Sequence, residues 1–145
     1  MFIAFIINSA LVAIAIMIHY EMLYRLSRLM PTLVIKHRYR LVVGIFGALM
    51  AHIAEIWMFA FGYHFVIKFT SLGTLIAFDS GESLEGIMNC IYYSFVTYTT
   101  LGFGDVIPTG SLRFLTGLEA LTGLVLITWT ASFMYFEMQK YWDDE

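Results

Sequence analysis

Charged residues are scarce in this chain of 145 residues: Asp, Glu, Lys and Arg together make up 13% of it, and the formal net charge is −3. A weakly acidic chain lacks the positive charge that binding to a nucleic-acid backbone requires, so nucleic acid is excluded as a partner. The single cysteine, Cys90, excludes an intrachain disulfide and a zinc site built from clustered cysteines. The sequence contains no internal repeat, low-complexity tract or interdomain linker, and we expect it to form one unit.

Apolar side chains dominate instead. They account for 60% of the residues, and the mean hydropathy is +0.79, whereas soluble domains are about 45–50% apolar. Three apolar stretches are long enough to cross a hydrocarbon core of about 30 Å, which takes around 20 helical residues. They cover residues 2–18, 41–62 and 112–136. We therefore predict an all-α membrane protein with three transmembrane helices, the first of them within residues 1–20.

The basic residues predict how the chain is oriented in the membrane. Five of the eight lie between the first two apolar stretches, and cytoplasmic loops are enriched in Lys and Arg. We expect residues 21–40 to form a basic cytoplasmic loop, the N-terminus to lie outside, and residues 138–145 to form a short cytoplasmic tail of a multi-pass protein in the cell membrane. The five residues are Arg25, Arg28, Lys36, Arg38 and Arg40.

A fourth apolar segment, residues 86–98, is too short to cross, because as a helix it is only about 20 Å long. Given the orientation above, it dips into the membrane from the external face and returns. The glycine-containing segment 99–105 follows directly and is expected to be non-helical. Irregular backbone at membrane depth is tolerated only where protein buries it or where it lines a watery cavity.

The composition of segment 99–105 suits the replacement of water around a cation. A dehydrated cation needs substitute oxygens, and backbone carbonyls can supply them if the backbone alternates between permissive torsions. Gly102 and Gly104 can adopt such torsions at little steric cost, and Thr100 adds a hydroxyl oxygen. The whole segment resembles the selectivity filter of the potassium-channel pore-loop family; it reads Thr99-Thr100-Leu101-Gly102-Phe103-Gly104-Asp105.

The resemblance extends over residues 41–137, which would form a pore domain like that of small bacterial potassium channels, with one extra N-terminal span. It implies that four copies surround one axis, because a single row of carbonyls cannot encircle an ion. A homotetramer in the lipid bilayer is therefore part of the prediction. The implied elements are an outer helix at 41–62, a pore helix at 86–98, the filter at 99–105 and an inner helix at 112–136.

The same resemblance assigns roles to single residues. Thr99 and Gly104 would support the filter, and Asp105 would lie at its outer mouth, held by Tyr92 of the pore helix. Gly123 would be the hinge of the inner helix. Potassium ions would be coordinated by the Thr100 hydroxyl and by the carbonyls of Thr100, Leu101, Gly102 and Phe103.

Two carboxylates, Glu55 and Glu119, lie inside predicted spans, where each costs about 2.5–3.5 kcal/mol on insertion scales. Their positions along the spans put them at nearly the same depth, behind the filter. His52 precedes Glu55 by one helical turn and shares its face. Three interpretations stay open: a polar cluster that braces the filter, a proton-sensitive gate, or a metal site, for which no further ligand of suitable spacing is evident. The expected hydrogen-bond donors to the carboxylates are Tyr93, Thr97 and Tyr98.

The resulting functional prediction is passive conduction of potassium, with no covalent chemistry, no enzymatic activity and no cofactor besides the permeant ion. The alternatives are a weakly selective cation channel and a non-conducting membrane subunit that serves assembly or sensing. The first span carries no arginine ladder, which argues against conventional voltage sensing. A tail of about nine residues is too short to fold a ligand-binding domain, which leaves room for a separate regulatory subunit.

Overall fold

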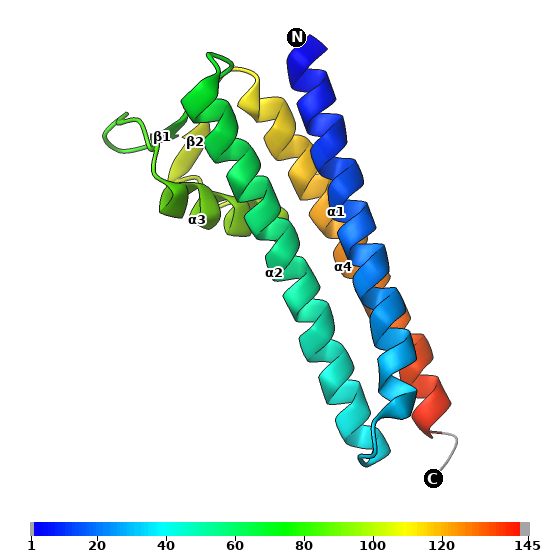
Figure 1. Ribbon diagram of the computed structural model, residues 1–145. Coiled ribbons are helices and arrows are strands. Elements are labelled where there is room, and N and C mark those ends of the chain that lie inside the picture. The colour runs from blue at the N-terminus through cyan, green and yellow to red at the C-terminus, as the bar shows by residue number, and fades with distance from the viewer. Residues whose placement is uncertain (1, 143–145) are drawn as a thin grey trace.

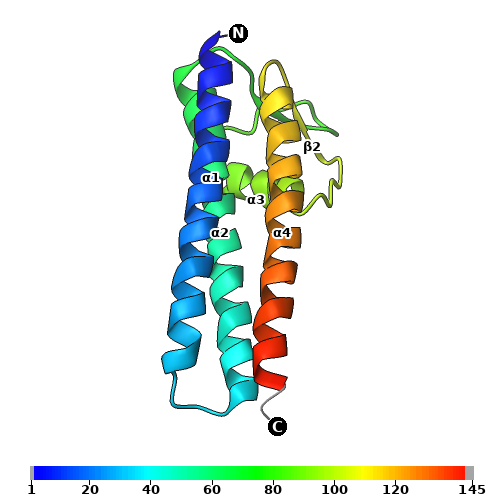
Figure 2. The same ribbon diagram turned by 90° about the vertical axis from the view of Figure 1, so that its right-hand side faces the viewer.

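Three long helices form the body of the protein in the computed structural model, which describes residues 2–142. They are α1 (Phe2–Leu29), α2 (His37–Phe69) and α4 (Leu112–Trp142), and they lie side by side along most of their length (Figures 1 and 2). At 1.5 Å per residue they are about 42–50 Å long, more than a bilayer core requires. Each is apolar enough to cross a membrane. The predicted all-α fold with three membrane-spanning helices is confirmed.

The predicted basic loop over residues 21–40 is much shorter in the structure. Helix α1 continues to Leu29, a 3₁₀ turn (η1) covers Met30–Thr32, and α2 already begins at His37. Only residues 33–36 connect the two helices without helical structure. Most of the basic residues assigned to a loop are therefore helical, and they lie where the helices project beyond the apolar stretches.

Local interactions explain why α1 does not stop at the end of its apolar stretch. Glu21 and Arg25, one turn apart, form an ion pair of 2.7 Å on the helix surface. Leu23 and Leu26 are buried against Ala48 of α2. Packing and pairing thus extend the helix over residues whose charge alone suggests a loop.

The short helix α3 (Ile87–Tyr98) lies beside the upper parts of α2 and α4 (Figures 1 and 2). Its 12 residues span about 18 Å, which agrees with the predicted half-span at 86–98. Gly86 precedes its first turn, and the chain leaves the helix at Thr99 with no regular structure from Leu101 to Phe103. Helix α3 therefore ends directly at the filter-like segment.

Two short strands, which the sequence did not predict, connect the chain on either side of α3. Strand β1 (Leu75–Ala77) pairs antiparallel with β2 (Val106–Pro108). Next to the strand pair, the Thr109 hydroxyl makes two hydrogen bonds to the backbone of Thr74. It donates to the Thr74 carbonyl at 3.0 Å and accepts from the Thr74 amide at 2.9 Å. The segment that follows residues 99–105 is thereby fixed to the segment that follows α2.

The main core lies at the level of α3, where all the helices meet. Side chains from each helix contribute to it, and several are fully buried. Because lipid is as apolar as the core, close packing and hydrogen bonds, more than the hydrophobic effect, hold such helices together. Representative members are Ala15 of α1, Phe59 and Tyr63 of α2, Tyr98 of α3 and Leu126 of α4.

Candidate functional site

The backbone of segment 99–105 alternates in a regular way. Thr100, Gly102 and Gly104 have φ angles of 58°, 56° and 79°, whereas the residues between them do not have positive φ. This alternation turns successive carbonyls toward the same side, unlike the back-and-forth arrangement of a strand. The sequence anticipated the torsions of the two glycines. The left-handed torsion of Thr100, which costs an L-residue about 1–2 kcal/mol, was not anticipated.

The amides of the segment point back toward α3. The N–H of Thr100 donates to the carbonyl of Thr97 at 2.9 Å, and the amides of Leu101 and Gly102 donate to the carbonyl of Val96 at 3.0 and 3.2 Å. These bonds use donors that would otherwise be unpaired. Within residues 2–142, none of the carbonyls from Thr99 to Gly104 accepts a hydrogen bond from the chain, and this run includes the four carbonyls of residues 100–103.

The segment is open to its surroundings in the single chain. The side chains of Leu101 and Phe103 are 59% and 65% exposed. A groove of about 330 Å³ lies beside them, bounded by α3, the segment itself and α4, with Val96 and Ala120 among its lining residues. This face is therefore available for contact with another chain.

Asp105 fixes the C-terminal end of the segment. The Tyr92 hydroxyl donates to Asp105 Oδ2 at 2.7 Å, which is the contact that the sequence analysis expected. The Asp105 carbonyl accepts from the amide of Phe78 at 2.8 Å, so the connection after β1 is held as well. The hydrogen bond to Asp105 raises the pKa of the Tyr92 hydroxyl above its ordinary value, so the hydroxyl stays protonated and remains a donor at neutral pH.

Glu119 of α4 lies behind α3 and is fully buried. Its carboxyl group is contacted by two hydroxyls: Tyr63 of α2 donates to Oε2 at 2.6 Å, and Ser94 of α3 lies against Oε1. The Ser94 hydroxyl also donates to the carbonyl of Ile56 at 2.8 Å. Glu119 thus joins three helices through hydrogen bonds at one point behind the filter-like segment.

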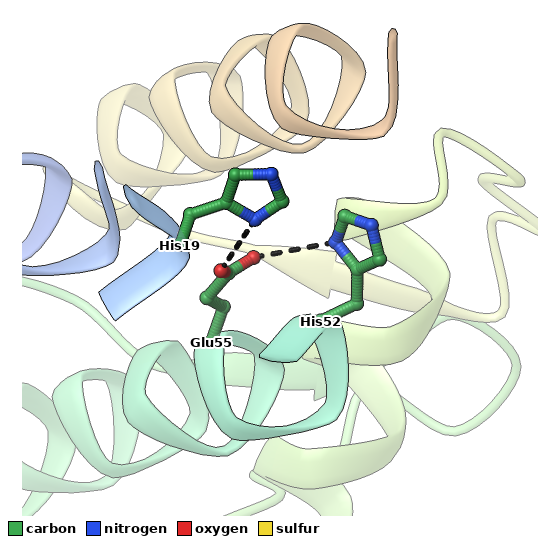
Figure 3. A group of neighbouring side chains, drawn as sticks. All are labelled: His19, His52 and Glu55. Atoms are coloured by element: carbon green, nitrogen blue, oxygen red, sulfur yellow. Dashed lines mark hydrogen bonds and ion pairs between the residues drawn. The ribbon is translucent and has the colours of Figure 1, made fainter. Parts of the chain in front are cut away.

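Glu55 of α2 forms a second cluster, one turn further along α3. Tyr98 donates to Glu55 Oε2, and His52 Nδ1 lies 3.3 Å from the same oxygen. His19 of α1 places its Nδ1 2.9 Å from Oε1. Figure 3 shows both imidazole rings directed at this carboxyl group. His19 and Glu55 are fully buried.

The hydroxyl donors differ in part from those expected. Of the three pore-helix hydroxyls predicted, only that of Tyr98 contacts a carboxyl group; Tyr93 instead pairs with Thr116 at 2.9 Å. Sequence reasoning missed Ser94, although it lies one turn before Tyr98 on the same face of α3, which is a usable signal. It also missed His19, which no local pattern connects to Glu55 across 36 positions. His19 completes a group of three potential metal donors with His52 and Glu55, although the spacing of the sequence gives no sign of this third ligand.

Gly123 lies where α4 crosses the end of α3. A Cβ atom at this position would come within 2.1 Å of the Tyr98 carbonyl oxygen. No side chain fits there unless one of the helices moves. Glycine is thus required at position 123 for the close contact between α4 and the end of α3. The resemblance had suggested a different role for Gly123, that of a hinge.

Comparisons with known proteins agree with this arrangement. A family model described as "ion channel" matches residues 39–139, well over half of the chain. The protein named two-pore potassium channel 1 from Arabidopsis thaliana is 32% identical over 69 residues, which cover 43% of this chain and 19% of that protein. The chain thus spans about a fifth of the length of this relative. No solved structure gives a significant match. With its three membrane-spanning helices and its pore loop, the chain belongs to the ion-channel family, within the pore-loop group that includes the potassium channels.

Proposed function

We propose that four copies of this chain surround one axis, so that the backbone carbonyls of residues 100–103 form rings around it. Potassium passes through these rings passively. The observation that carries the proposal is the alternation of positive φ along this segment, together with its four carbonyls that accept no hydrogen bond. Such oxygens replace the hydration water of a cation without adding a fixed charge. The family points to transport and away from enzymatic chemistry.

The need for four copies follows from the geometry of one. A single chain offers one row of carbonyls, and an ion requires oxygens on all sides. The exposed loop, with Leu101 and Phe103, and the groove beside it lie on the face that a neighbouring subunit would cover. In a closed ring of four copies, this face of each chain would lie against the next copy.

The charge distribution supports an orientation in which the filter opens to the outside. The end where α1 meets α2 carries most of the basic residues, which favours the cytoplasmic side. The opposite end carries the loop with Asp79, Glu82 and Glu85. The N-terminus and the β1–β2 pair lie at this second end (Figure 1). The N-terminus is therefore proposed to be external and the C-terminus cytoplasmic.

Other residues of the site serve the filter. The C-terminal end of α3 at Tyr98 directs partial negative charge toward the ion path, which favours a cation there. The Thr100 hydroxyl adds an oxygen at the inner end, and the hydrogen bond between Tyr92 and Asp105 holds the outer end. Glu55 and Glu119 fix the buried side of α3 against α2 and α4 through their hydrogen bonds.

A flux assay with purified protein in liposomes tests the proposal. We expect flux of potassium and rubidium, little flux of sodium, and block by barium. Gly102→Ala should reduce the flux, because φ is +56° there and alanine adopts this torsion at a cost of about 1–2 kcal/mol, which the segment already bears once at Thr100. Gly86→Ala is the matched control, because φ is −71° and no atom lies closer than 3.6 Å to the added Cβ.

Each alternative predicts a different result in the same assay. Equal flux of sodium and potassium would identify a weakly selective cation channel and would refute filter selectivity. No flux from correctly assembled protein would identify a non-conducting subunit and would refute the proposal. Wild-type flux in Gly102→Ala would show that the torsion of this residue does not limit conduction.

A further inference from the structure

The cluster around Glu55 has a feature that conduction does not require. His19 of α1, His52 and Glu55 of α2 each offer a ligand atom, and these atoms all lie within 4.8 Å of one another. Figure 3 shows the two rings converging on the carboxyl group from different helices. Two imidazoles and a carboxylate form a donor set typical of zinc sites.

The distances between donors fit a metal ion. Zinc binds imidazole nitrogen at about 2.0–2.1 Å and carboxylate oxygen at about 2.0–2.2 Å, so adjacent donors of a tetrahedral site lie about 3.3 Å apart. His19 Nδ1 lies 2.9 Å from Glu55 Oε1, and His52 Nδ1 lies 3.3 Å from Glu55 Oε2. Both carboxyl pairs already have close to the required spacing. All the donor atoms lie within 4.8 Å of one another, so the two imidazole nitrogens need to approach by at most about 1.5 Å to reach this spacing.

The outer nitrogens of both rings are also placed as in metal sites. His52 Nε2 lies 2.9 Å from the Thr130 hydroxyl oxygen, and His19 Nε2 lies 3.3 Å from the same atom. A histidine that binds a metal through one nitrogen normally donates its other N–H to such an oxygen, which fixes the ring. Thr130 of α4 can accept from both rings through its two lone pairs.

The fourth position of a tetrahedral site is accessible to a hydroxyl or a water molecule. The Tyr98 hydroxyl lies 2.9 Å from His52 Nδ1 and against Glu55, on the side of the cluster that faces α3. The His52 side chain keeps 13% of its surface exposed, so the cluster is not sealed. The all-oxygen coordination preferred by magnesium and calcium is not available from two imidazoles, whereas zinc accepts mixed nitrogen and oxygen ligands.

We propose that His19, His52 and Glu55 bind one divalent transition-metal ion per chain, with zinc as the best fit, and that Thr130 orients both imidazoles. The ion ties the N-terminal helix to α2 beside Tyr98, the last residue of α3 before the filter segment. It stabilises the folded state because the unfolded chain does not hold these ligands together. The proposal does not depend on conduction, and its test measures binding alone.

The experiment uses the full chain in detergent, purified with a tag that contains no histidine and then stripped of metal with a chelator. One sample of the stripped protein is supplied with zinc and dialysed to remove unbound metal, and its zinc content is measured. A second sample is titrated with cobalt, and its visible absorption is recorded. We expect one zinc per chain and the strong visible absorption of four-coordinate cobalt, which zinc should displace. Absence of stoichiometric zinc and of this absorption in the wild-type protein would overturn the proposal and leave the cluster as a hydrogen-bonded network.

Variants separate this site from adventitious binding. His19→Gln and His52→Gln should weaken zinc binding by at least about 100-fold, since each removes one of the protein ligands. Thr130→Val should weaken it about 10–100-fold, whereas Thr130→Ser keeps the hydroxyl and should restore wild-type affinity. His64→Gln is the control, because His64 lies about three turns further along α2 than His52 and its ring hydrogen-bonds to the Glu85 carbonyl.

If a histidine variant does not fold, the comparison of Thr130→Val with Thr130→Ser still tests the proposal. Equal zinc affinity in Thr130→Val and Thr130→Ser would contradict the orienting role of the hydroxyl. Loss of binding in His64→Gln, or unchanged binding in a folded His19→Gln protein, would place the metal elsewhere and refute the proposed site.

Discussion

Replacement of Gly123 by alanine is expected to displace α3 and with it the filter segment. The added Cβ would lie 2.1 Å from the Tyr98 carbonyl oxygen and 2.9 Å from its carbonyl carbon, whereas real Cβ contacts essentially never fall below 3.0 Å. One of the two helices must therefore move by about 0.9 Å or more at this crossing, since the obstacle is backbone and cannot rotate away.

Gly117→Ala on the same helix is the matched control, because no atom lies within 4 Å of its added Cβ. Alanine is favoured over glycine in a helix interior by about 1 kcal/mol, and both variants gain this term. Overpacking typically costs about 1–3 kcal/mol, and only Gly123→Ala incurs it. We therefore expect Gly123→Ala to be less stable than Gly117→Ala by about 2–3 kcal/mol, at the upper end of that range because the clash is with backbone.

Thermal unfolding of the assembled protein in mild detergent measures the stability difference, and potassium flux in liposomes measures the displacement of the filter. Gly117→Ala should be at least as stable as the wild-type protein and should conduct. Gly123→Ala should unfold at a lower temperature and lose flux. If the two variants were equally stable and equally active, the tight crossing of α3 and α4 would have no energetic importance and the reasoning would fail.

Three further predictions concern the contacts around the filter. Glu119→Gln keeps two polar atoms for its hydroxyl partners and should retain assembly. Glu119→Leu removes both hydrogen bonds, so that the Ser94 hydroxyl keeps only the Ile56 carbonyl and Tyr63 only its 3.4 Å contact with Thr116; we expect a loss of about 1 kcal/mol per bond, and equal thermal unfolding of the two variants would contradict this. Tyr92→Phe removes the hydrogen bond to Asp105 and should accelerate the decay of potassium current in planar bilayers. The pKa of the Tyr92 hydroxyl is raised above its ordinary value of 10, so the hydroxyl stays a donor throughout the range from pH 6 to 9. The difference in current decay between Tyr92→Phe and the wild-type protein should therefore be constant over this range, and a difference that disappears within it would refute the assignment. Gly110→Ala should reduce thermal stability by at least about 2 kcal/mol, because φ is +56° and the new Cβ would lie 2.3 Å from the Leu72 carbonyl oxygen; wild-type stability would show that the loop relaxes.

The elements that the sequence predicted well are those set by local patterns. An apolar run of helical length, or a glycine-containing loop after a short apolar segment, can be recognised from neighbouring residues alone, without knowledge of tertiary contacts. Helix α3 accordingly begins and ends within one residue of its prediction. The positive φ of Gly102 and Gly104 was expected for the same reason. The extension of α1 through residues 21–29 was not, because it depends on the packing of Leu23 and Leu26 against another helix.

The polar clusters show where sequence reasoning stops. Depth along a helix was enough to place Glu55 and Glu119 behind α3, since rise per residue is fixed. It could not select their partners, because helix rotation and crossing decide which side chains meet. His19 and Tyr63 reach the two carboxyl groups from residues 36 and 56 positions away. A three-donor cluster was thus invisible in the spacing of its members, although each lies within a predicted span.

The most direct test of the account is a density map of the assembled protein prepared in rubidium. The account predicts a four-fold particle with rubidium peaks on its axis, each between rings of the carbonyl oxygens of residues 100–103. A different number of subunits, or an axis without ions and with these peptides turned away from it, would contradict the proposed filter.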